Sequence, residues 1–279
     1  MGREHPPMGG EAGASRERCL LLPSRQCSCL LHIFCLLEPS LVSLCLLLCS
    51  YSLVLCAESA QHRAEIERRT ERPVTAIPAD LTKPEQIDAL FQEVPRRLRR
   101  LDVLVANPGG HVPYGGLEDL AEEQWYQAFE LLLMSAVRLS RLAVPLMRAQ
   151  GAGDIVFITS STVREPPQHL LLSNALQAGV TGFAKTLSRS LASYNIRVNV
   201  VAPGYFDTGR VRRRIDGIVE REHVPRQSAA LQVAGDVPLG RIGTAGELAE
   251  LVTFLVSRRA GFLTGATIQI DGGSSHSLF

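Results

Sequence analysis

The chain has 279 residues and a net charge of +1, with 29 basic residues against 28 acidic ones. Hydrophobic residues make up 46 % of it, enough for a large buried core, so wholesale disorder is excluded. The near-neutral charge excludes a general nucleic-acid binder, which needs a strongly basic balance. The length suits one α/β domain or two small ones.

The first 50 residues differ in composition from the rest of the chain. All seven cysteines lie in the interval from Cys19 to Cys56, among leucines. Disulfides are disfavoured because the cysteines stand in apolar runs, and a zinc site because no second ligand pair has the right spacing. We therefore predict an atypical apolar, cysteine-rich segment over residues 1–50, a domain over residues 51–279, and no metal site.

Residues 41–57 carry no charge, which reaches the lower limit of about 17 residues for a membrane-spanning helix. Two interpretations stay open. In one, this stretch anchors the protein to a membrane. In the other, which we favour, its end, Tyr51–Cys56, is a buried strand of the domain that follows. We thus predict a cytoplasmic protein, with membrane association through residues 41–57 as the alternative.

From Val74 onward, short apolar runs alternate with longer amphipathic segments. The predicted strands are Val74–Ala79, Val103–Ala106, Asp154–Thr159, Val198–Ala202 and Ala266–Ile270. The predicted helices are Pro84–Leu98, Leu120–Met147, Asn174–Ser193 and Glu247–Val256. This alternation predicts an α/β fold, a Rossmann-like doubly wound parallel sheet with helices on both faces. In such a sheet, ligands bind at the carboxyl ends of the strands.

The residues at those strand ends resemble motifs of the short-chain dehydrogenase/reductase family. The segments that carry the resemblance are Leu104–Gly109, Asp154–Ser160, Arg197–Gly204 with Thr208, Pro238–Gly243 and Thr264–Gly273. Their order and spacing are similar to those of the family. The resemblance implies an NAD- or NADP-dependent oxidoreductase of a small carbonyl or alcohol substrate, similar to the 3-oxoacyl carrier-protein reductases.

The resemblance also implies where the cofactor binds. The implied cofactor-binding residues are Asp80, Leu81, Asn107, Gly109, Pro203, Gly204 and Thr208. In the family, the position of Asp80 accepts a hydrogen bond from the adenine amino group, and the position of Asn107 faces the adenosine ribose or pins neighbouring strands. Each also has a purely structural interpretation, Asp80 as a helix-end carboxylate and Asn107 as a turn residue.

The glycine-rich turn that holds the pyrophosphate in this family is incomplete. Gly13-Ala14-Ser15-Arg16 resembles its start, but the last two glycines are missing. Glycines let the backbone approach a phosphate closely, and their side-chain-bearing replacements block it. Two explanations stay open: the chain binds a dinucleotide poorly, or its first 50 residues are divergent or misjoined.

The catalytic set of the family is Asn, Ser, Tyr and Lys, and only the serine is present. Counted from Ser160, the Tyr position falls 13 residues on at Ser173, the Lys position four further at Gln177, and the Asn position at Leu132. A serine is far less acidic than a phenol, and glutamine has no charge that lowers a neighbour's pKa. Losing a positioned general acid costs about 10²–10⁴ in rate.

The expected catalytic residues are therefore Ser160, Ser173 and Gln177, in a non-standard active site. Ser160 alternatively caps the loop after its strand, and Ser173 alternatively caps the helix that follows. Arg164 and His169 lie between the two serines and are further candidates for a proton donor, although each is more typical of a solvated loop.

Three functions stay open, and the sequence does not decide whether the chain is an enzyme. The favoured one is the oxidoreductase with a variant site around Ser160. The second is a catalytically inactive relative that binds a nucleotide, a metabolite or an active homologous subunit. The third is a membrane-tethered interaction module. The resemblance further implies a homo-oligomer, and no nucleic-acid partner is expected.

Overall fold

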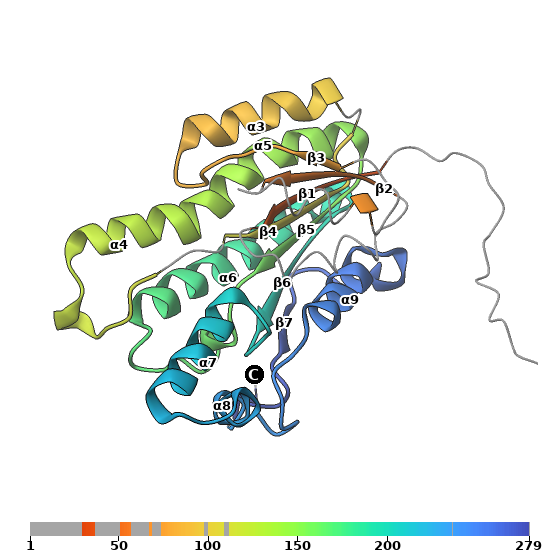
Figure 1. Ribbon diagram of the computed structural model, residues 1–279. Helices are drawn as coiled ribbons and strands as arrows, with labels where there is room; N and C mark the ends of the chain where they lie inside the picture. Colours follow the sequence, from red (N-terminus) through yellow and green to blue (C-terminus); the bar gives the residue numbers. More distant parts are fainter. Residues whose placement is uncertain are drawn as a thin grey trace, which may run out of the picture.

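A computed structural model describes residues 30–36, 51–56, 67–68, 74–97, 100–108, 112–235 and 237–278. In these residues, seven parallel strands form one sheet in the order β3-β2-β1-β4-β5-β6-β7 (Figure 1). The strand order reverses between β1 and β4, as it does in a doubly wound sheet. The fold is therefore the predicted α/β, Rossmann-like parallel sheet.

The strands are β1 (Leu30–Leu36), β2 (Tyr51–Cys56), β3 (Val74–Ala76), β4 (Val103–Asn107), β5 (Gly153–Ile158), β6 (Ile196–Pro203) and β7 (Thr267–Ile270). Strands β2 to β7 overlap the predicted ones. Strand β1 was not predicted, because a short apolar run inside a leucine-rich stretch does not reveal its secondary structure by periodicity. The sheet thus extends into the segment that the sequence analysis placed outside the domain.

Strand β2 settles how the end of the uncharged stretch 41–57 folds. Tyr51–Cys56 lies between β1 and β3, with Leu53 opposite both His32 and Val74 in the parallel register. The interpretation of Tyr51–Cys56 as a strand of the domain is therefore confirmed. Among the residues that the structure describes, no helix has the length and apolar character needed to cross a membrane.

The helices are α3 (Pro84–Arg97), α4 (Glu122–Ala128), α5 (Ser135–Gln150), α6 (Leu171–Leu191), α7 (Gly209–Glu222), α8 (Arg226–Val233) and α9 (Ala245–Val256). The predicted helix Leu120–Met147 is α4 and α5 joined by a π-helical segment, η3 (Phe129–Met134). Short 3₁₀ segments include η4 (Ser161–Val163), which follows β5. Segments of π-helix are often found at functional sites.

Successive residues of the central strands point to opposite faces of the sheet, and both faces are covered. Leu104 of β4 and Phe157 of β5 pack in a core with α3, α5 and α6. Val105 and Ile158, their chain neighbours, pack in a second core with α9 (Figure 1). Strands buried on both faces are continuous apolar runs, which is why the sequence predicted β4, β5 and β6 well.

Candidate active site

Ser160 follows β5 directly and is the N-cap of η4. Its Oγ accepts a hydrogen bond from the backbone N–H of Thr162, at 3.3 Å. Since the hydroxyl oxygen acts as an acceptor there, its own O–H is left to donate to a bound group. The capping interpretation of Ser160 is thus confirmed, and it is compatible with a role in the site.

Ser173 and Gln177 lie one turn apart in the first half of α6. This helix starts at Leu171 and has Leu170 as its N-cap, so the interpretation of Ser173 as the cap is wrong. Ser173 is instead buried, with 9 % of its surface exposed. Gln177 Nε2 donates a hydrogen bond to Ser173 Oγ at 3.4 Å, which again leaves the serine O–H to donate.

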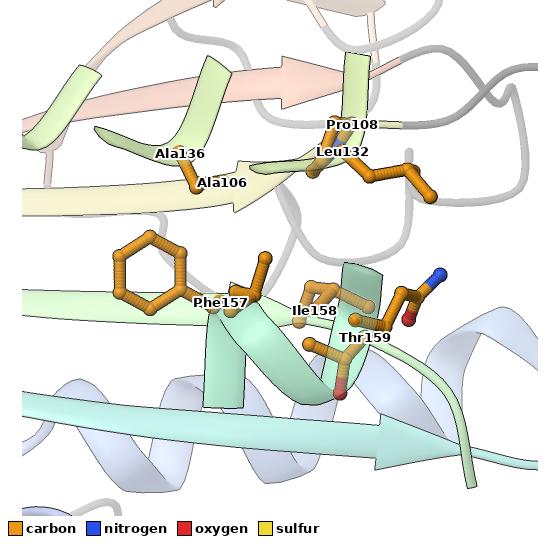
Figure 2. Close-up of a pocket in the computed structure, with 9 residues that line it drawn as sticks. Ala106, Pro108, Leu132, Ala136, Phe157, Ile158 and Thr159 are labelled. Atoms are coloured by element: carbon orange, nitrogen blue, oxygen red, sulfur yellow. The ribbon is translucent and has the colours of Figure 1, made fainter. Parts of the chain in front are cut away.

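A small cavity lies beside Gln177, between α6, η3 and the ends of β4 and β5 (Figure 2). It is lined by Ala106, Pro108, Leu132, Ala136, Phe157, Ile158, Thr159, Gln177 and Val180. The space suffices for about one water molecule. Leu132, at the position where the family resemblance places asparagine, is 4 % exposed and presents only carbon to the cavity.

Gln177 brings an unsatisfied polar atom to this otherwise mostly apolar lining. Its Oε1 is buried and accepts no hydrogen bond from any residue that the structure describes. A buried acceptor without a partner carries the full cost of losing water. Such an atom is suited to a hydroxyl donor that comes from a ligand or a bound water.

Asp80 follows β3, and the groups around it favour the ionised form of its carboxylate. Its Oδ1 accepts hydrogen bonds from the hydroxyl and the backbone N–H of Thr82, at 2.7 and 2.9 Å. These bonds, the one from the side chain first, lower the pKa of the Asp80 carboxyl. Leu81 is different, because its side chain lies in the core against α3.

The other implied cofactor residues lie at the ends of β4 and β6 or just beyond them. Strand β4 ends at Asn107 and strand β6 at Pro203. Thr208 is the N-cap of α7, and its Oγ1 accepts a hydrogen bond from Val211 N–H at 3.3 Å. The structure therefore gives Thr208 a structural role. Gly109 lies outside the described residues.

Gly204 is required by packing against the C-terminal turn. A Cβ at this position would stand 2.7 Å from the Cβ and 2.9 Å from the Cα of Asp271. We expect Gly204→Ala to lower the free energy of unfolding by about 1–3 kcal/mol, measured by urea denaturation. The control is Gly182→Ala on α6, where a Cβ meets nothing within 4 Å. An unchanged stability of Gly204→Ala would contradict this packing.

The side chain of Arg164 is hydrogen-bonded to the C-terminal strand β7. Its Nη2 donates to the backbone oxygen of Thr267 in β7, at 2.8 Å. His169 is exposed and stacks on Tyr114, with ring centroids 6.0 Å apart. No group of three or more His, Cys, Asp and Glu side chains in the described part of the chain is arranged to hold a metal ion.

Residues 50–275 match the family model described as enoyl-(acyl carrier protein) reductase. The chain belongs to the short-chain dehydrogenase/reductase family. It is 28 % identical over 213 residues to the NADPH-dependent reductase BacG of Bacillus subtilis, covering 76 % of this chain and 82 % of that protein. It is 32 % identical over 194 residues to the 3-oxoacyl-[acyl-carrier-protein] reductase FabG of Escherichia coli, covering 70 % of this chain and 75 % of that protein.

Solved structures of short-chain dehydrogenases/reductases have the same fold. L-sorbose reductase from Gluconobacter frateurii, complexed with NADPH and L-sorbose, superimposes with a TM-score of 0.83 at 28 % identity, covering 90 % of this chain and 98 % of that one. The predicted resemblance to the 3-oxoacyl carrier-protein reductases is thereby confirmed at the level of the family, by sequence and by fold.

The position of β1 bears on the glycine-rich turn of the family. In a Rossmann sheet, the pyrophosphate lies against the turn after the first strand. The segment Gly13-Ala14-Ser15-Arg16 precedes β1 and lies outside the described residues, so it does not stand in that place in the chain order. Residues 37–50, which follow β1, contain no glycine. The backbone freedom that a phosphate turn uses is therefore missing from the sequence after β1.

Proposed function

We propose that the chain is an NAD(P)-dependent oxidoreductase that acts on the carbonyl or hydroxyl group of a small substrate through a non-standard site with two serines. The observation that carries the proposal is that Ser160 Oγ and Ser173 Oγ both accept hydrogen bonds from the protein. Each hydroxyl therefore keeps its O–H group to donate a hydrogen bond to a substrate. Such donors hold a carbonyl oxygen and stabilise the negative charge that develops on it.

The residues present fit two parts of a nicotinamide dinucleotide. The buried Gln177 Oε1, which has no partner in the described chain, suits a ribose hydroxyl, and the ionised Asp80 carboxylate suits the adenine amino group. When bound, the nicotinamide supplies the hydride. The stretch after β1 suits the pyrophosphate poorly, because it has no glycine. We therefore expect weak cofactor binding.

The two serines stabilise charge but do not replace the phenol of the family as an acid. No cation stands at the Gln177 position to lower the pKa of a neighbouring hydroxyl, so the proton that completes the reduction comes from water. We expect a rate about 10²–10⁴-fold lower than that of a site with the tyrosine–lysine pair.

The test of this proposal is Ser160→Ala, assayed by NADPH oxidation with a panel of small ketones, sugars and 3-oxoacyl thioesters. We expect kcat to fall about 10²–10³-fold, as it does when one oxyanion-stabilising donor is removed. Ser161→Ala is the matched control, because it removes the hydroxyl of the next residue and should leave kcat unchanged. No turnover by the natural chain, or equal turnover by Ser160→Ala, would contradict the proposal.

Ligand binding without turnover is the second candidate function. It is favoured by Leu132, Ser173 and Gln177, which stand where the family has its catalytic asparagine, tyrosine and lysine. Saturable NADPH binding with no activity on the whole substrate panel would support this function over the first. Homo-oligomerisation also stays a prediction, and the mass of the folded protein in solution tests it.

A further inference from the structure

The Ser173 side of the candidate site is closed to a substrate in the structure. Ser173 is buried, and the cavity beside Gln177 has room for about one water molecule. A ketone that is to reach the Ser173 hydroxyl needs more space than this. Contact of a ketone with the Ser173 hydroxyl therefore needs movement of the chain around Ser173.

The segment that joins the two serines, residues 161–170, contains or contacts buried polar side chains that lack a partner in the described part of the chain. Thr162 Oγ1 and Asn174 Oδ1 are buried and have no hydrogen-bond partner among the described residues. Asn174 belongs to α6, and its Nδ2 donates to the Pro167 oxygen of this segment at 2.8 Å. Polar atoms buried without a partner disfavour the closed state, because movement of the segment would let water reach them.

The C-terminal segment, residues 271–278, holds this part of the chain in place. The Glu165 carboxylate accepts a hydrogen bond from His276 N–H at 2.7 Å, and its other oxygen lies 3.2 Å from His276 Nδ1. The His276 N–H bond is also the main cause that lowers the pKa of the Glu165 carboxyl. These partners are 111 residues apart in the sequence.

The C-terminal segment has an anchor of its own on the side of β7. The Asp271 carboxylate accepts hydrogen bonds from the backbone N–H groups of Gly273 and Ser275, at 3.0 and 2.9 Å. Asp271 comes directly after β7. The segment is thus fixed to the sheet at one end and contacts Glu165 at the other, which is the arrangement of a latch.

We propose that residues 161–170 form a flap over the candidate site and that the C-terminal segment latches it closed through Glu165. Glu165 acts on substrate access through the flap and contacts no reacting atom. The role of the latch in turnover rests on the proposed function, but the latch itself does not.

Amide hydrogen exchange of the full chain tests the latch directly. The Val163 N–H donates to the Ser160 carbonyl, that of Arg164 to Ser161 and that of Leu170 to Pro167. Exchange of these three N–H groups reports opening of the flap. We expect Glu165→Ala to speed their exchange about two- to fivefold, the range for an exposed charged contact. A chain that ends at Gly273 should show at least the same increase. Glu250→Ala, an exposed glutamate on α9, is the control and should change nothing there.

Two results separate this inference from the proposed function. Unchanged exchange over residues 161–170 in both Glu165→Ala and the shortened chain would overturn the latch, and would leave the oxidoreductase proposal as it stands. Faster exchange in a protein that shows no turnover would support the latch and count against the oxidoreductase. If both hold, Glu165→Ala should lower the substrate KM and leave kcat within a factor of about two, because access changes and the chemistry does not.

Discussion

The double variant Ser173→Tyr/Gln177→Lys is expected to reduce carbonyl substrates about 10²–10⁴-fold faster than the natural chain. The tyrosine supplies a phenol at the position of the Ser173 hydroxyl, and the lysine supplies the cation that lowers the pKa of this phenol toward neutrality. Both positions lie on the same side of α6, one turn apart and already in hydrogen-bond contact. The measurement is NADPH-dependent turnover on the panel described above.

The two single variants are the controls for this prediction. Ser173→Tyr alone keeps a phenol with a pKa near 10, and Gln177→Lys alone has no acid to act on, so each should gain far less than the pair. Simple additivity of the two gains would contradict the mechanism. A folded double variant that binds NADPH and gains no rate would place the remaining defect elsewhere, and Leu132→Asn is then the next change to add.

Arg197→Ala is expected to lower the free energy of unfolding by about 3–5 kcal/mol at pH 8, the cost of leaving a buried charge without its partner. The Arg197 guanidinium lies 2.7 Å from Asp154 Oδ1, and both side chains are largely buried. It also donates to the backbone oxygens of Ala260 and Ser257, at 2.6 and 3.2 Å. This arginine thus links β5 and β6 to the stretch before β7.

The effect of Arg197→Ala should depend on pH through Asp154. Burial raises the pKa of the Asp154 carboxyl from 3.8 to about 7, although Arg197 acts in the opposite direction. A pKa raised by folding means that the folded chain prefers protonated Asp154. The stabilisation from this proton is complete below pH 3.8 and is lost as the pH rises through about 7. The variant should therefore be less damaged at pH 5, where Asp154 is mostly neutral.

Urea denaturation at pH 5 and pH 8 measures this difference. Arg96→Ala is the control, because it breaks the exposed pair with Glu93 and should cost about 0–1 kcal/mol at either pH. Asp154→Asn should flatten the pH dependence of the natural chain over the same interval. An equal loss of stability in Arg197→Ala at both pH values would contradict the assignment of the titration to Asp154.

Most of the sheet was predictable because its strands are buried on both faces. Strands β4, β5 and β6 are continuous apolar runs between amphipathic helices, and such runs identify a parallel sheet. Strand β1 has the same character but lies in sequence that is apolar on both sides, so nothing marked its ends. The π-helical segment Phe129–Met134 was missed since its hydrophobic spacing differs little from that of the helices around it.

The residues of the candidate site stay a prediction, and their contacts could not be predicted from the sequence. Spacing from Ser160 located Ser173 and Gln177, and the structure places these two in contact. Sequence spacing could not reveal that Gln177 Oε1 has no partner among the described residues, because this depends on packing against η3 and the strand ends. Nor could it reveal the contact of Glu165 with His276, whose partners are far apart in the chain.

Titration of the full chain with NADPH and NADH tests the proposed oxidoreductase function, since an enzyme of this kind must bind its cofactor. The single tryptophan, Trp125, reports binding by fluorescence, because it packs in one cluster with Leu172, the neighbour of Ser173. We predict saturable quenching by at least one of the two nucleotides. The affinity should be weakened because residues 37–50, which follow β1, contain no glycine. No change in fluorescence and no bound nucleotide at millimolar concentration, in a protein shown to be folded, would contradict the claim.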